Sequence, residues 1–509
     1  MHQSINKLVI AGGGTAGWMA AALFKKMLPQ HLHIELVESE DIGIIGVGEA
    51  TIPPIQTFNS VLGIDEREFL RATQATLKLA IRFENWTTPG ESYFHTFGAP
   101  GTNIGFSSFH HYWLRARAQG LTTSLWDFDL NYLCCKAQVF GKIDSPDPIY
   151  QMPYAYHFDS ALYGRFLRAR CEQSGVKRTE GKIARVEQDA DSGNVIALLL
   201  ESGERIAGDF FIDCTGMRGL LIQGALNTGY EDWNHWLPCD RALAVPSERF
   251  EKTLPYTRAI AHPAGWQWRI PLQHRNGNGL VYSSSHLSDQ QAADTLMANL
   301  ESPALGDPKP IKFRTGRSKL QWHKNVVAVG LSSGFLEPLE STSIHLIQSA
   351  LVRLLKLFPQ QGISDAARDQ YNREAQIEYE TVRDFIILHY FLNARSDSDF
   401  WQDLQRMAIP DRLSQKLALF KTTGAIVNDP LDIFLDSSWL QVMLGQGQMP
   451  QDFHPVARQP SDAQLQDMLQ RIAATKQQPV KAFPSHDQFL REYLGSIAQA
   501  HKAAGAIGA

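Results

Sequence analysis

The fold of this chain is decided by one stretch of sequence, KLVIAGGGTAGWMAAALFKKML at residues 7–28. A short apolar run typical of a buried strand leads directly into a glycine cluster, and residues of helical composition follow. The segment HIELVE at residues 33–38 has the composition of a second buried strand. This order of strand, helix and strand predicts a βαβ unit and therefore an α/β domain of the Rossmann type.

The glycine cluster contains a GxGxxG motif placed where a dinucleotide would bind. Gly12 permits the tight turn, Gly14 lets the backbone approach a pyrophosphate, and Gly17 lets helix and strand pack closely. The free N–H groups at the start of the helix favour the anion. Glu38 ends the second strand, where an acid can bind a ribose 2′-OH, which disfavours NADP. The residues predicted to bind the dinucleotide here are Gly12, Gly14, Thr15, Ala16, Gly17 and Glu38.

The composition is that of a globular protein with room for a large core: 509 residues, 44% hydrophobic, formal net charge -5. The mild negative charge without a basic run argues against nucleic acid as a partner. No apolar run approaches the roughly 20 residues of a membrane span, and no leader precedes the first strand, so we expect a cytoplasmic protein without a membrane partner. The five cysteines are irregularly spaced, which predicts reduced core thiols and no metal site.

The rest of the chain adds further elements to the nucleotide-binding sheet. Residues 157–216 predict a helix, a β-ribbon with turns and the buried strand FFID, and VVAVG at 326–330 predicts another buried strand that leads through a loop into a helix. After about residue 365 the pattern becomes helical and polar. We therefore expect two parts, residues 1–365 binding the dinucleotide with an inserted β-sheet segment and residues 366–509 forming a helical part that closes the substrate pocket.

The choice of FAD as the dinucleotide comes from resemblance. The segment DCTG at 213–216 and the later strand ending in Gly330 resemble the second and third flavin-contacting segments of FAD proteins of the glutathione-reductase and hydroxylase class. The resemblance implies a Rossmann-like FAD domain of that type. The further flavin contacts that it implies are Ala50, Val186, Leu331 and Ile344.

A more specific resemblance begins with GWQWRIP at 265–271. Read by itself, this is a strand that packs two tryptophans on one face. It matches the WxWxIP signature of the flavin-dependent tryptophan halogenases, and similarity to that family extends over nearly the whole chain. In the family this motif lies near the flavin and keeps the substrate from entering a monooxygenase mode of reaction.

Two residues match the family's catalytic pair. Lys78, in TLKLAIRFENW at 76–86, falls on the catalytic lysine, although a lysine in a partly apolar stretch is commonly a surface residue whose stem packs against the protein. Beside the substrate it would act on hypohalous acid as a hydrogen-bond donor or as the amine of a haloamine. Glu340, in GFLEPLESTS at 334–343, matches the glutamate that helps remove the ring proton.

The residues after Glu340 match the family's halide site with one departure. Thr342 and Ser343 are predicted to lie at the halide, but Ser343 stands where the family has glycine. A side chain there would strain any φ > 0 geometry and would crowd the ion, which puts the halide preference in question. A simpler interpretation, in which Ser341 or Thr342 caps the following helix, is compatible with this one.

The resemblance also places the substrate. The segment GVGEATIPP at 46–54 resembles the family's strap between flavin and substrate sites, with Ala50 facing the flavin. His95 and Phe97 match the residues that sandwich an indole ring, and Trp439 is a third candidate wall, although such aromatic residues are commonly plain core. The tyrosine-rich stretch that binds the amino-acid part of free tryptophan is not found. A simpler indole or a larger aromatic is therefore expected at least as much as tryptophan.

These observations predict a two-component flavin-dependent halogenase that uses FADH2, dioxygen and chloride or bromide. No second GxGxxG offers a site for NAD(P)H, so a separate flavin reductase is the expected partner, and a homodimer is one expectation for the assembly. One rival function is an aromatic monooxygenase, which would need direct access of its substrate to the flavin. A second rival is a non-catalytic flavin-binding protein, in which Lys78 and Glu340 would be expendable.

Overall fold

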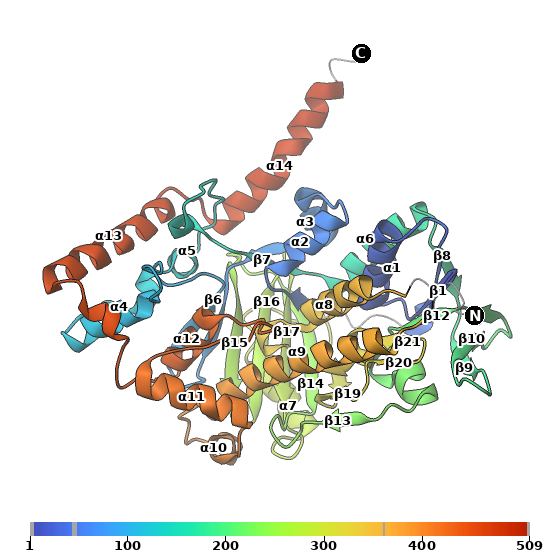
Figure 1. Cartoon of the computed structure of the whole chain (residues 1–509). Coiled ribbons are helices and arrows are strands. Elements are labelled where there is room, and N and C mark those ends of the chain that lie inside the picture. Colours follow the sequence, from blue (N-terminus) through green and yellow to red (C-terminus); the bar gives the residue numbers. More distant parts are fainter. Residues whose placement is uncertain (1–4, 43–47, 360–361, 506–509) are drawn as a thin grey trace. The chain divides into compact units, whose positions relative to one another are not determined.

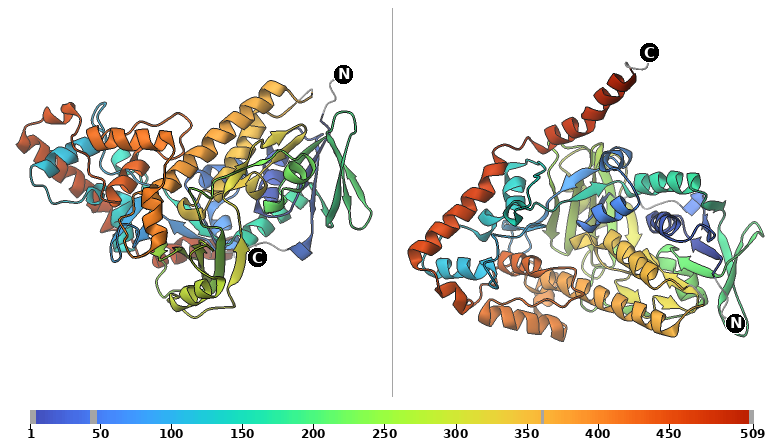
Figure 2. Two further views of the ribbon diagram at one scale, coloured as in Figure 1. Left: turned by 90° about the horizontal axis from the view of Figure 1, so that it is seen from below. Right: turned by 45° about the horizontal axis from the view of Figure 1, so that its top comes forward.

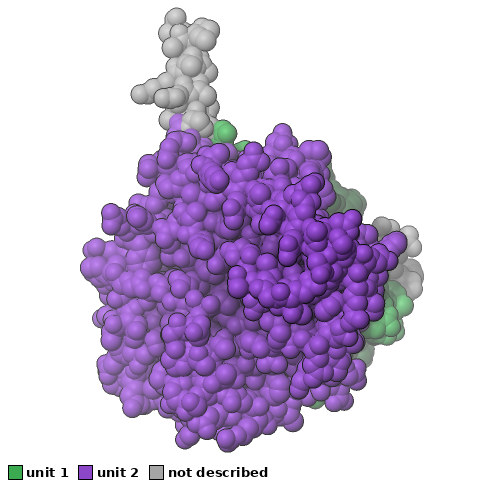
Figure 3. Space-filling view, turned by 90° about the vertical axis from the view of Figure 1, so that its left-hand side faces the viewer, with its two compact units in different colours: residues 1–74, 158–243, 309–383 green, residues 75–157, 244–308, 384–509 purple. Residues whose placement is uncertain are grey.

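The computed structural model describes residues 5–42, 48–359 and 362–505, the last ten of these by their backbone alone. The chain divides into two compact units, and each of them is discontinuous in sequence (Figure 3). Unit 1 comprises Met1–Gln74, Phe158–Leu243 and Lys309–Arg383, and unit 2 comprises Ala75–His157, Ala244–Pro308 and Asp384–Ala509. The predicted division into a dinucleotide-binding part, residues 1–365, and a pocket-closing part, residues 366–509, concerns function and stays a prediction.

Unit 1 is built on a largely parallel sheet with the strand order β20-β21-β12-β1-β2-β8. Strand β1 lies at its centre and pairs in parallel with β2 and with β12. The predicted βαβ opening is thus confirmed, and the strand FFID lies beside the first strand. The bounds are β1 Lys7–Ala11, β2 His33–Glu38, β8 Lys177–Glu180, β12 Phe210–Asp213, β20 Trp322–His323 and β21 Val326–Ala328.

Helices α1, α6 and α8 pack in unit 1 next to this sheet (Figure 1). Helix α1 is rich in alanine, methionine and lysine, which favour the helical backbone, and it buries Trp18, Met19 and Phe24. Short strands and two further helices complete the unit. The bounds are α1 Thr15–Met27, β3 Glu49–Ala50, α2 Pro54–Val61, α3 Glu66–Ala72, α6 Ser160–Gln173, β13 Tyr230–Asp232, β18 Lys309–Lys312, β19 Gly316–Ser318, β22 Gly334–Phe335 and α8 Ser343–Lys356.

The predicted β-ribbon is present as a three-stranded antiparallel sheet of β9 (Ile183–Gln188), β10 (Val195–Leu200) and β11 (Arg205–Ala207). Figure 2 shows it in green beside the blue N-terminal strand of the same unit. Leu198 and Leu200 of the ribbon share one buried cluster with Val9 and Val37 of the parallel sheet. This shared apolar core fastens the ribbon to the nucleotide-binding sheet.

Unit 2 contains a mixed sheet in which β14, β17, β16, β15, β5 and β6 follow one another. Its strand β16 carries the WxWxIP motif and is buried along its whole length, since it lies between β15 and β17. Two further strands, β4 and β7, pair antiparallel. The bounds are β4 Thr76–Lys78, β5 Ala80–Glu84, β6 Ser92–Thr96, β7 Ala155–Phe158, β14 Arg241–Glu248, β15 Tyr256–His262, β16 Gly265–Pro271 and β17 Arg275–Tyr282.

The part of the chain after residue 365 is helical, as predicted (Figure 1). Across residues 5–42, 48–359 and 362–505, no helix combines the length and the apolar character that a membrane span requires. The helices outside unit 1 and the long helix α9 have the bounds α4 Phe109–Ala118, α5 Leu130–Ala137, α7 Asp289–Ala298, α9 Asp365–Phe391, α10 Asp399–Arg406, α11 Asp411–Thr423, α12 Asp436–Gly445, α13 Asp462–Val480 and α14 His486–Gly505.

Candidate active site

The GxGxxG loop has the tight turn predicted at Gly12 and the close packing predicted at Gly17. Gly12 has φ +107°, and a Cβ atom there would lie 2.2 Å from the carbonyl oxygen of Cys214. A Cβ atom on Gly17 would lie 1.9 Å from the carbonyl oxygen of Gly12. At Gly14, by contrast, a Cβ atom would meet no atom within 4 Å. Gly12 and Gly17 are therefore required by the fold, whereas Gly14 borders open space.

The start of helix α1 is suited to an anion. Gly14 is its N-cap and makes no side-chain hydrogen bond, and the first turn carries no acidic residue. The free N–H groups at this helix start are therefore not capped by a side chain, and no acid of the first turn offsets the helix dipole. The neighbouring hydroxyl of Thr15 donates to the carbonyl of Ser160 at 3.2 Å, so it is directed to helix α6. Open space at Gly14 beside an uncapped helix fits the pyrophosphate of FAD.

Glu38 is held in place by partners that the sequence did not reveal. Its Oε1 atom accepts from Arg178 Nε at 2.6 Å and lies 3.4 Å from Arg168 Nη1. A Cβ atom on Gly13 would lie 1.6 Å from Glu38 Oε2, so the carboxylate lies directly over the glycine loop. The sequence signal for this close approach was Gly13, the middle one of three consecutive glycines, which the GxGxxG motif itself does not require. Glu38 thus reaches the predicted cofactor region with its orientation fixed by arginine.

The three predicted flavin-contacting segments meet at the glycine loop. Cys214 lies against Gly12, and a Cβ atom on Gly330 would lie 3.0 Å from the Cβ of Ala16. Asp213 accepts backbone hydrogen bonds of 2.9 Å from Thr215, Leu221 and Ile222, which orders the segment DCTG. The remaining predicted flavin contacts differ in exposure: Ala50 and Ile344 are buried, Val186 is half-buried on the ribbon, and Leu331 is 37% exposed.

The predicted strap is described from Gly48 onward, since residues 43–47, which include its first two positions, lie outside the described residues. Glu49 and Ala50 form strand β3. Burial, with a smaller contribution from the negative charge of Asp159, raises the pKa of Glu49 to about 7. A carboxyl group next to the predicted flavin contact therefore titrates near neutral pH.

This titration predicts a pH-dependent stability. The pKa of Glu49 is about 7 in the folded protein against an ordinary value of 4.5. The folded state therefore favours the protonated carboxyl group: its contribution to stability is complete below about pH 4.5 and is lost as the pH rises through about 7. Glu49→Gln should therefore gain about 2 °C or more in melting temperature relative to the parent between about pH 5 and about pH 8. Thermal unfolding of the flavin-free protein measures this. A constant difference across that range would contradict it.

The predicted halide segment joins a short 3-10 turn, η7 (Pro338–Glu340), to helix α8. Glu340 is 1% exposed, and Ser341 has φ +61°. The expectation that Ser343 would strain a positive φ is wrong, because Ser343 is the first residue of α8 and the left-handed residue is Ser341. Thr342 is the N-cap but makes no side-chain capping bond, and its buried hydroxyl has no hydrogen-bond partner in the described part of the chain. An uncapped helix start with a spare hydroxyl fits an anion.

Lys78 is completely buried, which excludes the surface interpretation. It ends strand β4, and two neutral histidines hold the residues before it. The hydroxyl of Thr76 lies 3.1 Å from His157 Nδ1, and the N–H of Leu77 donates to His486 Nε2 at 3.2 Å. Burial, then the charge of Lys78, lowers the pKa of His157 well below its usual range, and burial lowers that of His486 to about 4. Nothing in the sequence pattern marked these histidines.

The predicted substrate walls lie in the same unit as Lys78. The ammonium nitrogen of Lys78 is 5.0 Å from the centre of the Phe97 ring. His95 contacts Phe385 at 5.5 Å between ring centres, and Phe385 contacts Trp439 at 4.9 Å. Phe385 was missed from the sequence because it belongs to the helix α9, far from the matched motifs. Unit 2 thus contains two sets of contacts, Lys78 with Phe97 and His95 with Phe385 and Trp439, and the short segment from His95 to Phe97 connects them.

The WxWxIP strand contacts the strand of Lys78 through its last residue. The hydroxyl of Thr76 donates to the carbonyl of Pro271 at 2.7 Å. Trp266 and Trp268 lie on one face, as predicted, with 6.3 Å between their ring centres. Glu340 belongs to unit 1, whereas Lys78 belongs to unit 2.

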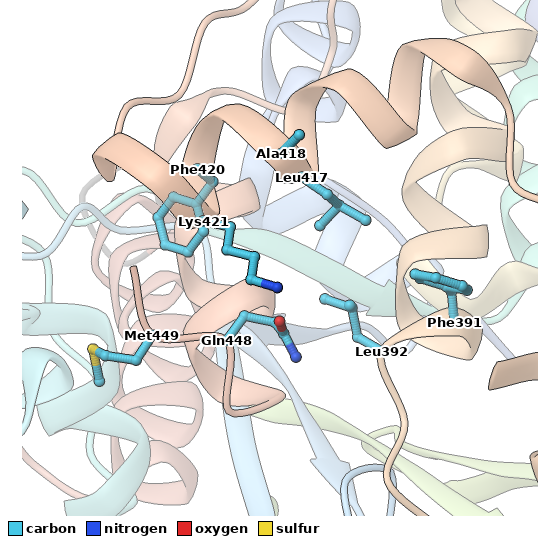
Figure 4. Close-up of a pocket in the computed structure, with 8 residues that line it drawn as sticks. All are labelled: Phe391, Leu392, Leu417, Ala418, Phe420, Lys421, Gln448 and Met449. Carbon is cyan, nitrogen blue, oxygen red and sulfur yellow. The ribbon is translucent and has the colours of Figure 1, made fainter. Parts of the chain in front are cut away.

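A separate pocket of about 200 Å³ lies on unit 2, away from the candidate residues (Figure 4). Figure 4 shows Phe391 and Leu392 facing Lys421 and Gln448 across it. None of the predicted cofactor, halide, catalytic or substrate residues lines this pocket. This pocket is therefore not part of the candidate active site.

Comparison with known proteins agrees with this geometry. The family model described as tryptophan halogenase matches residues 7–462. The chain is 37% identical over 441 residues to the tryptophan 6-halogenase SttH of Streptomyces toxytricini, covering 82% of this chain and 84% of that protein. The chain therefore belongs to the tryptophan halogenase family.

Solved structures of flavin-dependent halogenases have the same fold as this chain. Xcc4156, a flavin-dependent halogenase from Xanthomonas campestris, superimposes with a TM-score of 0.94 at 47% identity, covering 96% of this chain and 99% of that one. BrvH, a flavin-dependent halogenase from Brevundimonas sp. BAL3, gives 0.92 at 44% identity, covering 96% and 98%. The protein described here is a flavin-dependent halogenase, an oxidoreductase whose family implies FAD and a halide.

Proposed function

We propose that this enzyme halogenates an indole-type aromatic ring, using FADH2 delivered by a separate flavin reductase, dioxygen, and chloride or bromide. The observation that carries the proposal is the buried ammonium of Lys78 beside the ring of Phe97. A cation in an apolar, aromatic setting is costly to bury, and it is retained where it has chemistry to perform. The uncapped starts of α1 and α8 support the dinucleotide and the halide.

Each residue has a distinct task in this proposal. Bound FADH2 would supply the reducing equivalents with which dioxygen and halide yield hypohalous acid. Lys78 holds or carries the halogen next to the substrate, as ammonium donor or as amine. The ring carbon forms the bond to halogen while water leaves, and Glu340 takes part in removing the ring proton. Thr342 and Ser343 hold the halide, and Glu38 and the glycine loop hold the flavin.

The candidate substrate walls are aromatic, which suits an indole-type ring. His95 and Phe97 are predicted to sandwich the ring, and Trp439 closes the group from helix α12. Trp439 donates its own N–H to the carbonyl of Phe434 at 3.1 Å, so its polar atom is satisfied within the protein. The Trp439 ring contacts the Phe385 ring, and the ammonium of Lys416 lies 4.5 Å from the centre of the Trp439 ring. The candidate walls thus offer aromatic rings for an indole to stack on.

An assay with a supplied reductase tests this function. The protein is incubated with FAD, a flavin reductase, NADH, air, either halide and a panel of indoles, and products are identified by mass. The expected result is mono-halogenated indole that requires FAD and halide. Hydroxylated product without halogen would favour a monooxygenase, and turnover of flavin without any product would favour a flavin-binding protein.

The open space at Gly14 gives a clean test of the flavin site. Gly14→Val should fold normally, since a Cβ atom meets nothing there, but its side chain should occupy the pyrophosphate position. We expect affinity for FAD to fall by about tenfold or more, as measured by quenching of flavin fluorescence. Gly306→Val is the matched control, because Gly306 also has open space and no positive φ but lies outside the glycine loop. Unchanged affinity in Gly14→Val would place the cofactor elsewhere.

A further inference from the structure

Thr96 connects the predicted substrate walls to helix α12. It ends strand β6, which lies at the end of the strand order of its sheet. Its N–H donates to Gln441 Oε1 at 2.9 Å, and Gln441 Nε2 donates back to the carbonyl of Thr96 at 3.3 Å. The side-chain amide of Gln441 thus pairs with the strand as a neighbouring strand would. Both residues are buried, so no water replaces these bonds.

The side chain of Thr96 is held as firmly as its backbone. Its hydroxyl donates to the carboxylate of Asp129, and the N–H of Gly98 donates to the same hydroxyl oxygen at 3.2 Å. His95 lies next to Thr96 on strand β6, so its side chain projects to the opposite face, and Phe97 follows Thr96 directly in the chain. Bonds in two directions at Thr96 therefore fix the direction of both substrate-facing side chains.

The same network reaches the strand of Lys78. The carbonyl of Leu79 accepts from the N–H of Phe97 at 3.0 Å and from Asn131 Nδ2 at 3.2 Å. The N–H of Asn131 in turn donates to Asp129 at 2.8 Å. The residue next to Lys78 and the residue before Phe97 are therefore joined by a short chain of buried hydrogen bonds.

We propose that Gln441 is a positioning residue for the halogenation: through Thr96 it sets His95 and Phe97 against helix α12, which carries Trp439. The inference rests on the proposed function, because it concerns where an indole ring lies. Gln441 touches no substrate itself. Its loss moves the aromatic walls apart and lets the ring take more than one orientation, so the position of halogenation becomes less specific.

Two variants test this role. Gln441→Met keeps the volume but leaves the N–H and the carbonyl of Thr96 without their partner, and should lower kcat/KM by about tenfold or more, mainly through KM. It should also broaden the ratio of halogenated regioisomers. The carboxylate of Gln441→Glu can still accept from the N–H of Thr96, but only its protonated form can also donate to the carbonyl of Thr96. The regioisomer ratio of this variant should therefore return toward that of the parent as the pH falls. This second variant decides the question if Gln441→Met does not fold.

The matched control is Gln446→Met, at the C-cap of the same helix. Gln446 is also buried and donates to the carbonyl of His389 at 2.7 Å, so it should lose similar stability. Its regioisomer ratio and KM should stay those of the parent. Parental regioisomer ratios in both Gln441 variants, or equal broadening in Gln446→Met, would overturn the positioning role.

A measurement without turnover separates this inference from the proposed function. Binding of 5-fluoroindole to the flavin-free protein is followed by fluorine NMR. The parent and Gln446→Met should bind alike, and Gln441→Met should bind about tenfold more weakly. A parent protein that neither binds nor halogenates indoles refutes the proposed function and, with it, this inference. A parent that does both, with Gln441→Met binding equally well, refutes the positioning role alone.

Discussion

Lys78→Ala should abolish ring halogenation while the enzyme continues to oxidise reduced flavin. The ammonium of Lys78 is completely buried and lies 5.0 Å from the ring centre of Phe97. If it holds or carries the halogen, its removal eliminates the step that delivers halogen to the substrate, whereas oxygen activation depends on the cofactor. We expect product formation to fall by about 10³-fold or more. Oxygen consumption and halogenated product, measured in the same reaction, should separate.

The control for Lys78 must distinguish lost chemistry from lost packing. Lys78→Met retains most of the buried volume and removes only the charge, so it should fold at least as stably as Lys78→Ala and be equally inactive. Lys136→Ala replaces an exposed lysine of the same unit and should keep full activity. Halogenation at the parental rate in Lys78→Met would show that free hypohalous acid suffices and that the resemblance assigned the wrong residue.

Glu340→Gln should slow halogenation by about 10²-fold or more, the range usual for a positioned acid or base. Glu340 is 1% exposed, at the end of the turn that precedes helix α8. The amide keeps the shape of the side chain but cannot take a proton from the halogenated ring cation. Flavin oxidation should again be preserved, and the rate of product formation under saturating indole measures the loss.

Glu337 provides the matched carboxylate for this experiment. It lies three positions earlier in the same segment and is also fully buried, so Glu337→Gln reproduces the loss of a buried charge. It should cost far less activity than Glu340→Gln if the proton transfer belongs to Glu340. If Lys78 and Glu340 act on one intermediate, as proposed, the effects of their double variant need not be additive. Equal losses in the two glutamine variants would indicate a structural role for the segment instead.

The sequence by itself determined the nucleotide-binding fold and most of the positions in the candidate site. Strand periodicity and the spacing of Gly12, Gly14 and Gly17 are local signals, because the turn, the pyrophosphate approach and the helix packing all occur within a few residues. The family signatures likewise located Lys78 and Glu340 as contiguous motifs. The helical composition after residue 365 was also correctly predicted, since it too is a local property.

Only the tertiary structure decided what surrounds those positions. His157 and His486 approach the strand of Lys78 from positions 81 and 409 residues away, and Gln441 meets Thr96 across 345 residues. Such partners have no local pattern, because a buried polar group is satisfied by whatever the fold brings within hydrogen-bond reach. The same holds for Ser343, whose backbone conformation follows from where helix α8 begins. The sequence therefore predicted which groups react, and the fold supplied the hydrogen bonds that hold the neighbouring segments in place.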